Sequence, residues 1–151
     1  MYVEILREQQ RLDGLFERVK GFGDDEVKAH LAKYLCVLVS AFLENSMRIV
    51  VLKYVGTRSH NNVLTFVNSR LRYVTNLNEE KLKQLLGAFS GDWRIRFESD
   101  ISDEQKAALD SVTNLKNRVA HGNTADVSFV RINNYYQNIR KVVEVIQKIC
   151  V

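Results

Sequence analysis

Apolar residues recur at intervals of three and four positions along most of this chain, which is the spacing of one face of an α-helix. Gly, Asn, Ser or acidic residues bound the segments with this spacing, as is typical of helix ends. These segments predict six helices, at about 2–20, 24–54, 60–74, 78–89, 102–122 and 127–151. Residues 90–100 contain the only tryptophan and a short alternating stretch, and they predict a loop or a brief extended piece. We therefore expect an all-α fold, a single up-and-down bundle of about five to six helices.

Two of the predicted helices have apolar faces that must be covered. The helix at 60–74 carries one face, made of Val63, Phe66, Val67, Leu71 and Val74. The last helix carries one row made of Phe129, Ile132, Tyr136, Ile139, Val143 and Ile146, and a second row made of Tyr135, Val142 and Ile149. A helix as apolar as the last one must bury more than one side, in a bundle core or between subunits.

The composition agrees with a helical, globular protein. The chain has no proline and only seven glycines, the two residues that most often break helices. Its 151 residues, 46% of them hydrophobic and 26% charged, are typical of one soluble domain spanning 1–151. We find no internal repeat, low-complexity tract or linker that would divide it.

The cysteines and the apolar runs bear on cellular location. Cys36 and Cys150 lie in apolar helical patterns and outside zinc-binding spacings, which indicates buried thiols in a reducing compartment and no metal site. The first ten residues lack the apolar core of a signal peptide. The most apolar run, residues 34–43, is ten residues long, which is too short to span a bilayer. We therefore expect a cytoplasmic protein that does not contact membranes.

Positive charge is unevenly distributed along the chain. Residues 45–78 contain no acid, and their five basic residues are Arg48, Lys53, Arg58, Arg70 and Arg72. Residues 111–151 contain six Lys and Arg against two acids. A basic surface of this kind is able to meet phosphates, although a solvated face is the simpler explanation of charge alone.

The helix predicted from Ser102 to near Gly122 separates into two faces on an ideal helical wheel. Its apolar arc holds Ile101, Ala108, Val112, Leu115 and Val119, with Leu109 and Ala120 at the edge. Its polar arc holds Asp110, Asn114, Asn117, Arg118 and His121. Lys116 falls within the apolar arc, where an unpaired buried cation is costly. We therefore expect Lys116 to extend toward solvent or to meet a polar partner.

His121 stands directly before Gly122, at the predicted end of this helix. Histidine exchanges protons near neutral pH, so it is suited to acid or base chemistry. Alternatively, His121 and Gly122 only close the helix, where a cation favours the C-terminal dipole. The spacing alone leaves both interpretations open.

Residues 116–122, KNRVAHG, resemble the signature of the HEPN superfamily of small α-helical domains. In that signature an Arg is followed by a polar residue, and a His lies five positions after the Arg. The stretch YLCVLVSAFLENSMRIVVLKYV, residues 34–55, is similar to a helix of the RiboL-PSP type of HEPN domain, in which an apolar run leads into a Glu. The resemblance covers about residue 28 to residue 151.

The resemblance implies an RNA-binding fold that is often a metal-independent endoribonuclease without a cofactor. Such domains commonly pair as homodimers, in which two copies of the motif line one cleft. His121 matches the catalytic His, and Asn117 matches the polar residue after the Arg. Lys116 stands where the family has Arg, and lysine keeps the charge but lacks the planar fork that grips a phosphate in two places. Arg118 or Arg48 could supply the guanidinium instead.

Glu44 matches the Glu of the family's helix, but Glu44 and Arg48 are also four residues apart, where an ion pair within one helix is an equally good explanation. His30 and His60 lie outside the motif, and we do not expect either to be catalytic. The resemblance thus favours an endoribonuclease that cleaves RNA as a toxin or defence factor, with an antitoxin or regulatory protein as a possible partner. The alternative is a HEPN-like module that binds RNA or dimerises without cleaving.

Overall fold

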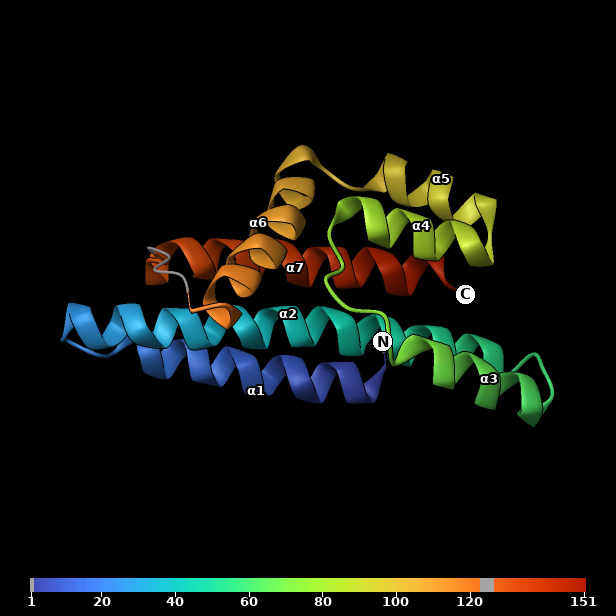
Figure 1. Ribbon diagram of the computed structural model, residues 1–151, viewed down its shortest axis with the longest axis horizontal. Helices are drawn as coiled ribbons and strands as arrows, with labels where there is room; N and C mark the ends of the chain where they lie inside the picture. Colours follow the sequence, from blue (N-terminus) through green and yellow to red (C-terminus); the bar gives the residue numbers. More distant parts are fainter. Residues whose placement is uncertain (1, 123–126) are drawn as a thin grey trace.

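The computed structural model describes residues 2–122 and 127–151. These residues form seven α-helices and no strand (Figure 1). The helices are α1 (Val3–Lys20), α2 (Asp25–Gly56), α3 (Asn61–Leu71), α4 (Glu79–Phe89), α5 (Gly91–Asp100), α6 (Asp103–Ala120) and α7 (Phe129–Ile149). The all-α prediction is confirmed, with slightly more helices than the five to six expected.

Two long helices, α2 and α7, form the centre of the bundle. They pack against each other, and α1 lies along α2 while α6 crosses both of them (Figure 1). The short helices α4 and α5 pack together, and α5 also reaches α7. The apolar side chains that these helices bury form one continuous core.

The α2 helix is, among the described residues, the one helix long and apolar enough to cross a membrane. It contains the run at 34–43, so the ten-residue run is part of a 32-residue helix. Side chains along most of its length, from Ala32 to Val55, are nevertheless buried against the neighbouring helices. Packing in the bundle core therefore accounts for the apolar character of α2, as the sequence suggested.

Residues 91–100 form helix α5, so the prediction of a loop or extended piece at 90–100 is wrong. The Ser90 hydroxyl accepts a hydrogen bond from the Trp93 backbone N–H at 3.3 Å and so caps the helix. Trp93 and Phe97, four residues apart, are 5% and 0% exposed. The alternation of apolar and polar residues was misleading because Ile95, which completes it, is 66% exposed.

The two apolar rows of α7 are covered within the chain itself. Val142 and Ile149 of the second row are fully buried, and Tyr135 is half-buried. Four helices pack around α7, namely α1, α2, α5 and α6. Of the two explanations for the doubly apolar helix, burial in the bundle core is sufficient, and α7 no longer supports a subunit interface.

Both cysteines are buried and unpaired, as predicted. Burial raises the pKa of the Cys36 thiol to about 11 and that of the Cys150 thiol to about 12. These thiols therefore stay protonated at neutral pH and act as small apolar core residues.

Candidate functional site

The motif helix α6 is held in place at its start and along its apolar face. The Ser102 hydroxyl accepts from the Gln105 backbone N–H at 3.2 Å, and the Gln105 side chain accepts from the Ser102 backbone N–H at 3.0 Å. This capping box satisfies two backbone donors that would otherwise lack partners. The predicted apolar arc is largely confirmed, because its buried members are Ile101, Ala108, Leu109, Val112 and Leu115. The cap and this face together decide which side chains of the motif turn away from the core.

Lys116 meets a polar partner, as its position on the wheel required. It is half-buried, and its Nζ donates a hydrogen bond to Asn76 Oδ1 at 3.0 Å. Asn76 lies in the segment between α3 and α4 and has a φ of 57°, in the left-handed region that Asn tolerates better than most residues. The lysine head is thus attached to a turn that lies 40 residues earlier in the chain.

Glu44 contacts the same turn from the other side. Its Oε1 accepts a hydrogen bond from the Asn76 backbone N–H at 3.1 Å. Asn76 therefore joins α2 to α6, through Glu44 and Lys116, and we call these three residues the Asn76 bridge. Sequence reasoning selected the two outer residues but missed Asn76. The sequence feature that could have indicated Asn76 is its position directly before Leu77, a buried residue in a connecting segment.

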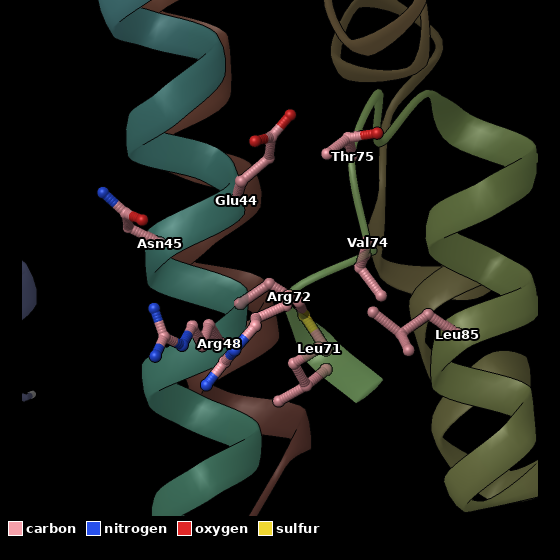
Figure 2. Close-up of a pocket in the computed structure, with 9 residues that line it drawn as sticks. Glu44, Asn45, Arg48, Leu71, Arg72, Val74, Thr75 and Leu85 are labelled. Atoms are coloured by element: carbon pink, nitrogen blue, oxygen red, sulfur yellow. The ribbon is translucent and has the colours of Figure 1, made fainter. Parts of the chain in front are cut away.

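Arg48 turns to α3 instead of pairing with Glu44. Its Nη2 donates to Asn68 Oδ1 at 3.1 Å, and among the described residues Glu44 and Arg48 form no ion pair. Both residues line a cavity of about 190 Å³ with Arg72 and Thr75. Figure 2 shows Glu44 extending toward the segment that carries Thr75, away from the guanidinium of Arg48. The intrahelical ion pair considered as an alternative is therefore absent.

His121 and Arg118 lie exposed at the C-terminal end of α6. The His121 backbone N–H donates to Asn117 O at 3.0 Å, and Gly122 follows with a φ of 72°. Only glycine adopts this left-handed conformation without strain, so the His-Gly pair does end the helix. None of the described residues forms a hydrogen bond with the His121 imidazole, which is accessible for other chemistry. Asn117 is half-buried beside a shallow pocket on the α4 side.

The chain matches the family model of the RiboL-PSP-HEPN domain over residues 3–151. It belongs to the RiboL-PSP-HEPN family. The resemblance seen in KNRVAHG and in residues 34–55 is confirmed, and the match also includes α1. No curated protein and no solved structure matches the chain.

Within this HEPN domain the selected residues divide into two groups. Glu44 and Lys116 meet at Asn76, whereas Arg118 and His121 are exposed at the helix end. Residues three apart on a helix are neighbours on its surface, so Arg118 lies beside His121. Lys116 and His121 are five apart, about 140° around the helix, so their side chains leave it in different directions. Arg118 is therefore the cation best placed next to the imidazole.

The other two histidines lie outside the motif, and His30 lines a surface pocket with Lys33 and Arg131. His60 caps α3, because its Nδ1 accepts from the Asn62 backbone N–H at 3.2 Å. His30 is exposed on α2, outside the motif. Across residues 2–122 and 127–151, no three His, Cys, Asp or Glu side chains are grouped so that they could hold a metal ion.

Proposed function

We propose that this HEPN domain is a metal-independent endoribonuclease of the cytoplasm, in which His121 exchanges protons with the substrate. The observation that carries the proposal is an accessible imidazole at the end of the motif helix in a chain of this family. The biological setting that fits such an activity is that of a toxin or defence factor. A free nuclease of this kind needs restraint, so an antitoxin or other regulatory protein is part of the proposal.

RNA cleavage without a metal requires three groups. A base takes the proton of the 2′-OH, whose oxygen attacks the phosphorus; an acid protonates the 5′-oxygen as the P–O5′ bond breaks. The products are a 2′,3′-cyclic phosphate and a free 5′-hydroxyl. A cation stabilises the charge of the phosphorane between these two steps. One chain offers one motif histidine, so a homodimer with two facing copies of His121 would supply both the base and the acid.

The cations of the motif can together stabilise the negative charge of the phosphorane. One of the three N–H donors of Lys116 is used by Asn76, which leaves two for a phosphate oxygen. Arg118 offers the planar guanidinium that Lys116 lacks, and it neighbours His121 on the helix. Arg48 is less suited to this task because it lies on α2 and bonds Asn68 of α3, outside the motif helix.

A second candidate function is a HEPN module that binds RNA or dimerises without cleaving it. The observation that favours it is the half-buried position of Lys116 and its bond to Asn76. This contact gives the lysine a structural role of its own, namely to hold the segment between α3 and α4 against α6. Lys116 at the position of the family's Arg would then serve the fold and not the reaction.

The deciding experiment incubates the purified protein with RNA in EDTA. We expect the wild type to cleave, His121→Ala to be slower by at least about 100-fold, and His30→Ala, an exposed histidine outside the motif, to match the wild type. Lys116→Ala and Lys116→Arg complete the set, with circular dichroism to confirm folding. Cleavage by Lys116→Arg alone would show that the wild type is a nuclease that has lost its activity, as the second candidate requires. If the RNA stays equally intact with the wild type and with His121→Ala, and Lys116→Arg does not cleave it either, the endoribonuclease proposal is refuted. If the wild type sediments as a monomer at micromolar concentration, the proposal that two subunits share one active-site cleft is refuted.

A further inference from the structure

Helix α3 has an apolar face that the rest of the described chain covers only in part. α3 packs only against α2, at one end of the molecule (Figure 1). Of the five apolar residues predicted to form its face, only Leu71 is buried, whereas Val63 and Phe66 are 47% and 57% exposed. Tyr73, two residues after the helix, is 80% exposed. Aromatic rings this exposed can stack with a ligand.

The cations on and beside α3, which are the five at 45–78, form no direct ion pair with a carboxylate of the described residues. Their partners are neutral: Arg48 bonds Asn68, and the Arg70 guanidinium lies 5.2 Å from the centre of the Phe66 ring. The basic character of this stretch, visible in the sequence, is therefore retained as net positive charge at the surface.

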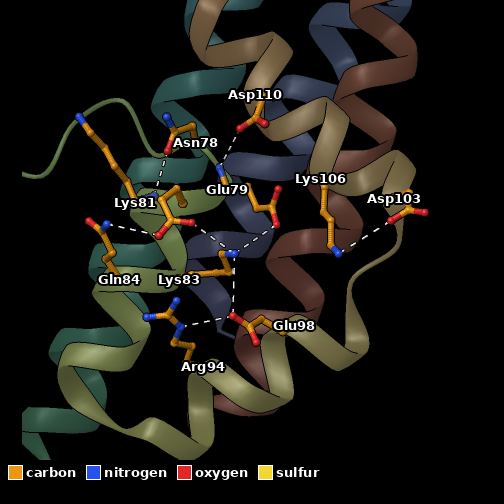
Figure 3. A network of polar contacts seen from close by, with 11 residues as sticks. Asn78, Glu79, Lys81, Lys83, Gln84, Arg94, Glu98, Asp103, Lys106 and Asp110 are labelled. Atoms are coloured by element: carbon orange, nitrogen blue, oxygen red, sulfur yellow. Dashed lines mark hydrogen bonds and ion pairs between the residues drawn. The ribbon is translucent and has the colours of Figure 1, made fainter.

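The surface formed by α4 and α5 shows the opposite arrangement. There Lys83 lies within 4 Å of three carboxylates, those of Glu79, Glu80 and Glu98 (Figure 3). Arg94 also pairs with Glu98, at 3.3 Å. Cations that pair in this way stabilise the protein's own surface, whereas the unpaired cations near α3 keep their charge available for an external anion.

Two of these cations converge on one cavity. Arg48 from α2 and Arg72, which follows α3, both line the cavity of about 190 Å³ (Figure 2). Glu44 lines it too, but one of its oxygens is bonded to the Asn76 backbone N–H. Guanidinium groups bind phosphate oxygens in pairs and remain charged at any working pH. The cavity thus combines the charge, donors and size for one phosphate group.

We propose that α3 and the facing part of α2 bind a single-stranded segment of RNA. We call Arg48, Phe66, Arg70, Arg72 and Tyr73 the α3 surface. Arg48 and Arg72 hold a backbone phosphate in the cavity, while Phe66 and Tyr73 stack with bases. Stacking requires bases that are free of a duplex, which selects single strands over double-stranded RNA. That the anion is RNA rests on the proposed function; the α3 surface itself is separate from His121.

The α3 surface is continuous with the motif through the chain. Val74 and Thr75 line the same cavity as Arg72, and the next residue is Asn76, which holds Lys116. A strand bound in the cavity therefore lies beside the segment that positions the motif lysine. The surface extends the RNA contact beyond the cleavage position.

The test measures binding of a fluorescent single-stranded RNA by anisotropy, in EDTA, with His121→Ala as the parent so that cleavage cannot interfere. We expect Arg72→Glu and Tyr73→Ala each to weaken binding by about tenfold or more, and Arg72→Glu also to lower the dependence on salt. Lys141→Glu, an exposed residue of α7, makes the same change in net charge. Tyr34→Ala removes another exposed tyrosine. Both controls should stay within about twofold of the parent.

Several outcomes would count against the α3 surface. Parent-like binding by Arg72→Glu and Tyr73→Ala overturns it, as does equal weakening by the matched controls, which would indicate a general charge effect. Equal affinity for a duplex of the same sequence would refute the preference for single strands. If the parent does not bind RNA at all, the α3 surface is not an RNA-binding site. Cleavage by the wild type with unaffected binding by the variants leaves the nuclease proposal intact. RNA binding that depends on the α3 surface, without cleavage by the wild type, supports the surface and refutes the nuclease proposal.

Discussion

Asn76 offers the sharpest test of how the site is assembled, because its backbone and its side chain form hydrogen bonds with different residues. The φ of 57° is a property of the backbone, and Glu44 bonds its N–H, whereas Lys116 bonds its side chain. Asn76→Gly removes only the side-chain bond, since glycine adopts a positive φ freely. Asn76→Ala removes the same bond and also forces an alanine into the left-handed region.

The expected magnitudes follow from these two contributions. A hydrogen bond to a charged donor contributes about 1.5–3 kcal/mol when buried, and the half-buried position of Lys116 reduces this to about 1 kcal/mol. For Asn76→Gly, the relief of left-handed strain roughly offsets the added freedom of the unfolded chain, so we expect a loss of about 1 kcal/mol. The left-handed alanine costs about 1–2 kcal/mol more, which places Asn76→Ala at about 2–3 kcal/mol.

Urea unfolding followed by circular dichroism measures these free energies. A double-mutant cycle of Asn76→Gly with Lys116→Met should give a coupling energy of about 1 kcal/mol, because either single change already removes the bond. Equal stability of Asn76→Gly and Asn76→Ala would refute the left-handed turn. A coupling energy within about 0.3 kcal/mol of zero would refute the bond between Asn76 and Lys116.

Two further predictions concern the core and the motif helix. Burial raises the pKa of Cys36 to about 11 and that of Cys150 to about 12, from 9.0. The stabilisation linked to a raised pKa is complete below the unfolded pKa and is lost as pH rises to the folded pKa, so the free energy of unfolding should decline above about pH 9. Each thiol contributes up to about 1.4 kcal/mol per pH unit. Urea midpoints from about pH 8 to pH 11 should show a shallower decline for Cys36→Ala/Cys150→Ala, and an unchanged slope would contradict the buried thiols. Ser102→Ala removes the cap of α6 and should lower stability by about 1 kcal/mol in the same assay, whereas Ser99→Ala, at an exposed position, should change little; equal effects would rule out the capping box.

The helices that sequence patterns predicted well are those with strong local signals. Asn78 and Ser102 accept hydrogen bonds from the backbone N–H of the third residue of their helices, as their residue types indicated. Sequence patterns did not predict α5 because only two buried residues, Trp93 and Phe97, show its helical spacing, and an exposed isoleucine lies between them. A helix of ten residues offers too few positions for its period to outweigh such a misleading residue.

The candidate site shows the same division. The wheel of α6 indicated that Lys116 needs a polar partner and that Arg118 and His121 turn outward, because these are properties of a single helix. It could not indicate that the partner is Asn76, since nothing in the spacing of residues 40 apart identifies a contact. Arg48 was expected near Glu44 or the motif, yet it bonds Asn68, on a helix whose packing angle the sequence does not reveal.

By itself, the sequence determined where six of the seven described helices begin, which faces are apolar, and which signature marks the family, because caps and helical periodicity act over a few residues. The tertiary structure alone decided which distant elements meet. It covered both rows of α7 within one chain, joined Glu44 and Lys116 through Asn76, and left the aromatic and arginine side chains of α3 exposed. Such contacts depend on how whole helices pack against one another, and their free energy is shared among residues that lie far apart in the chain.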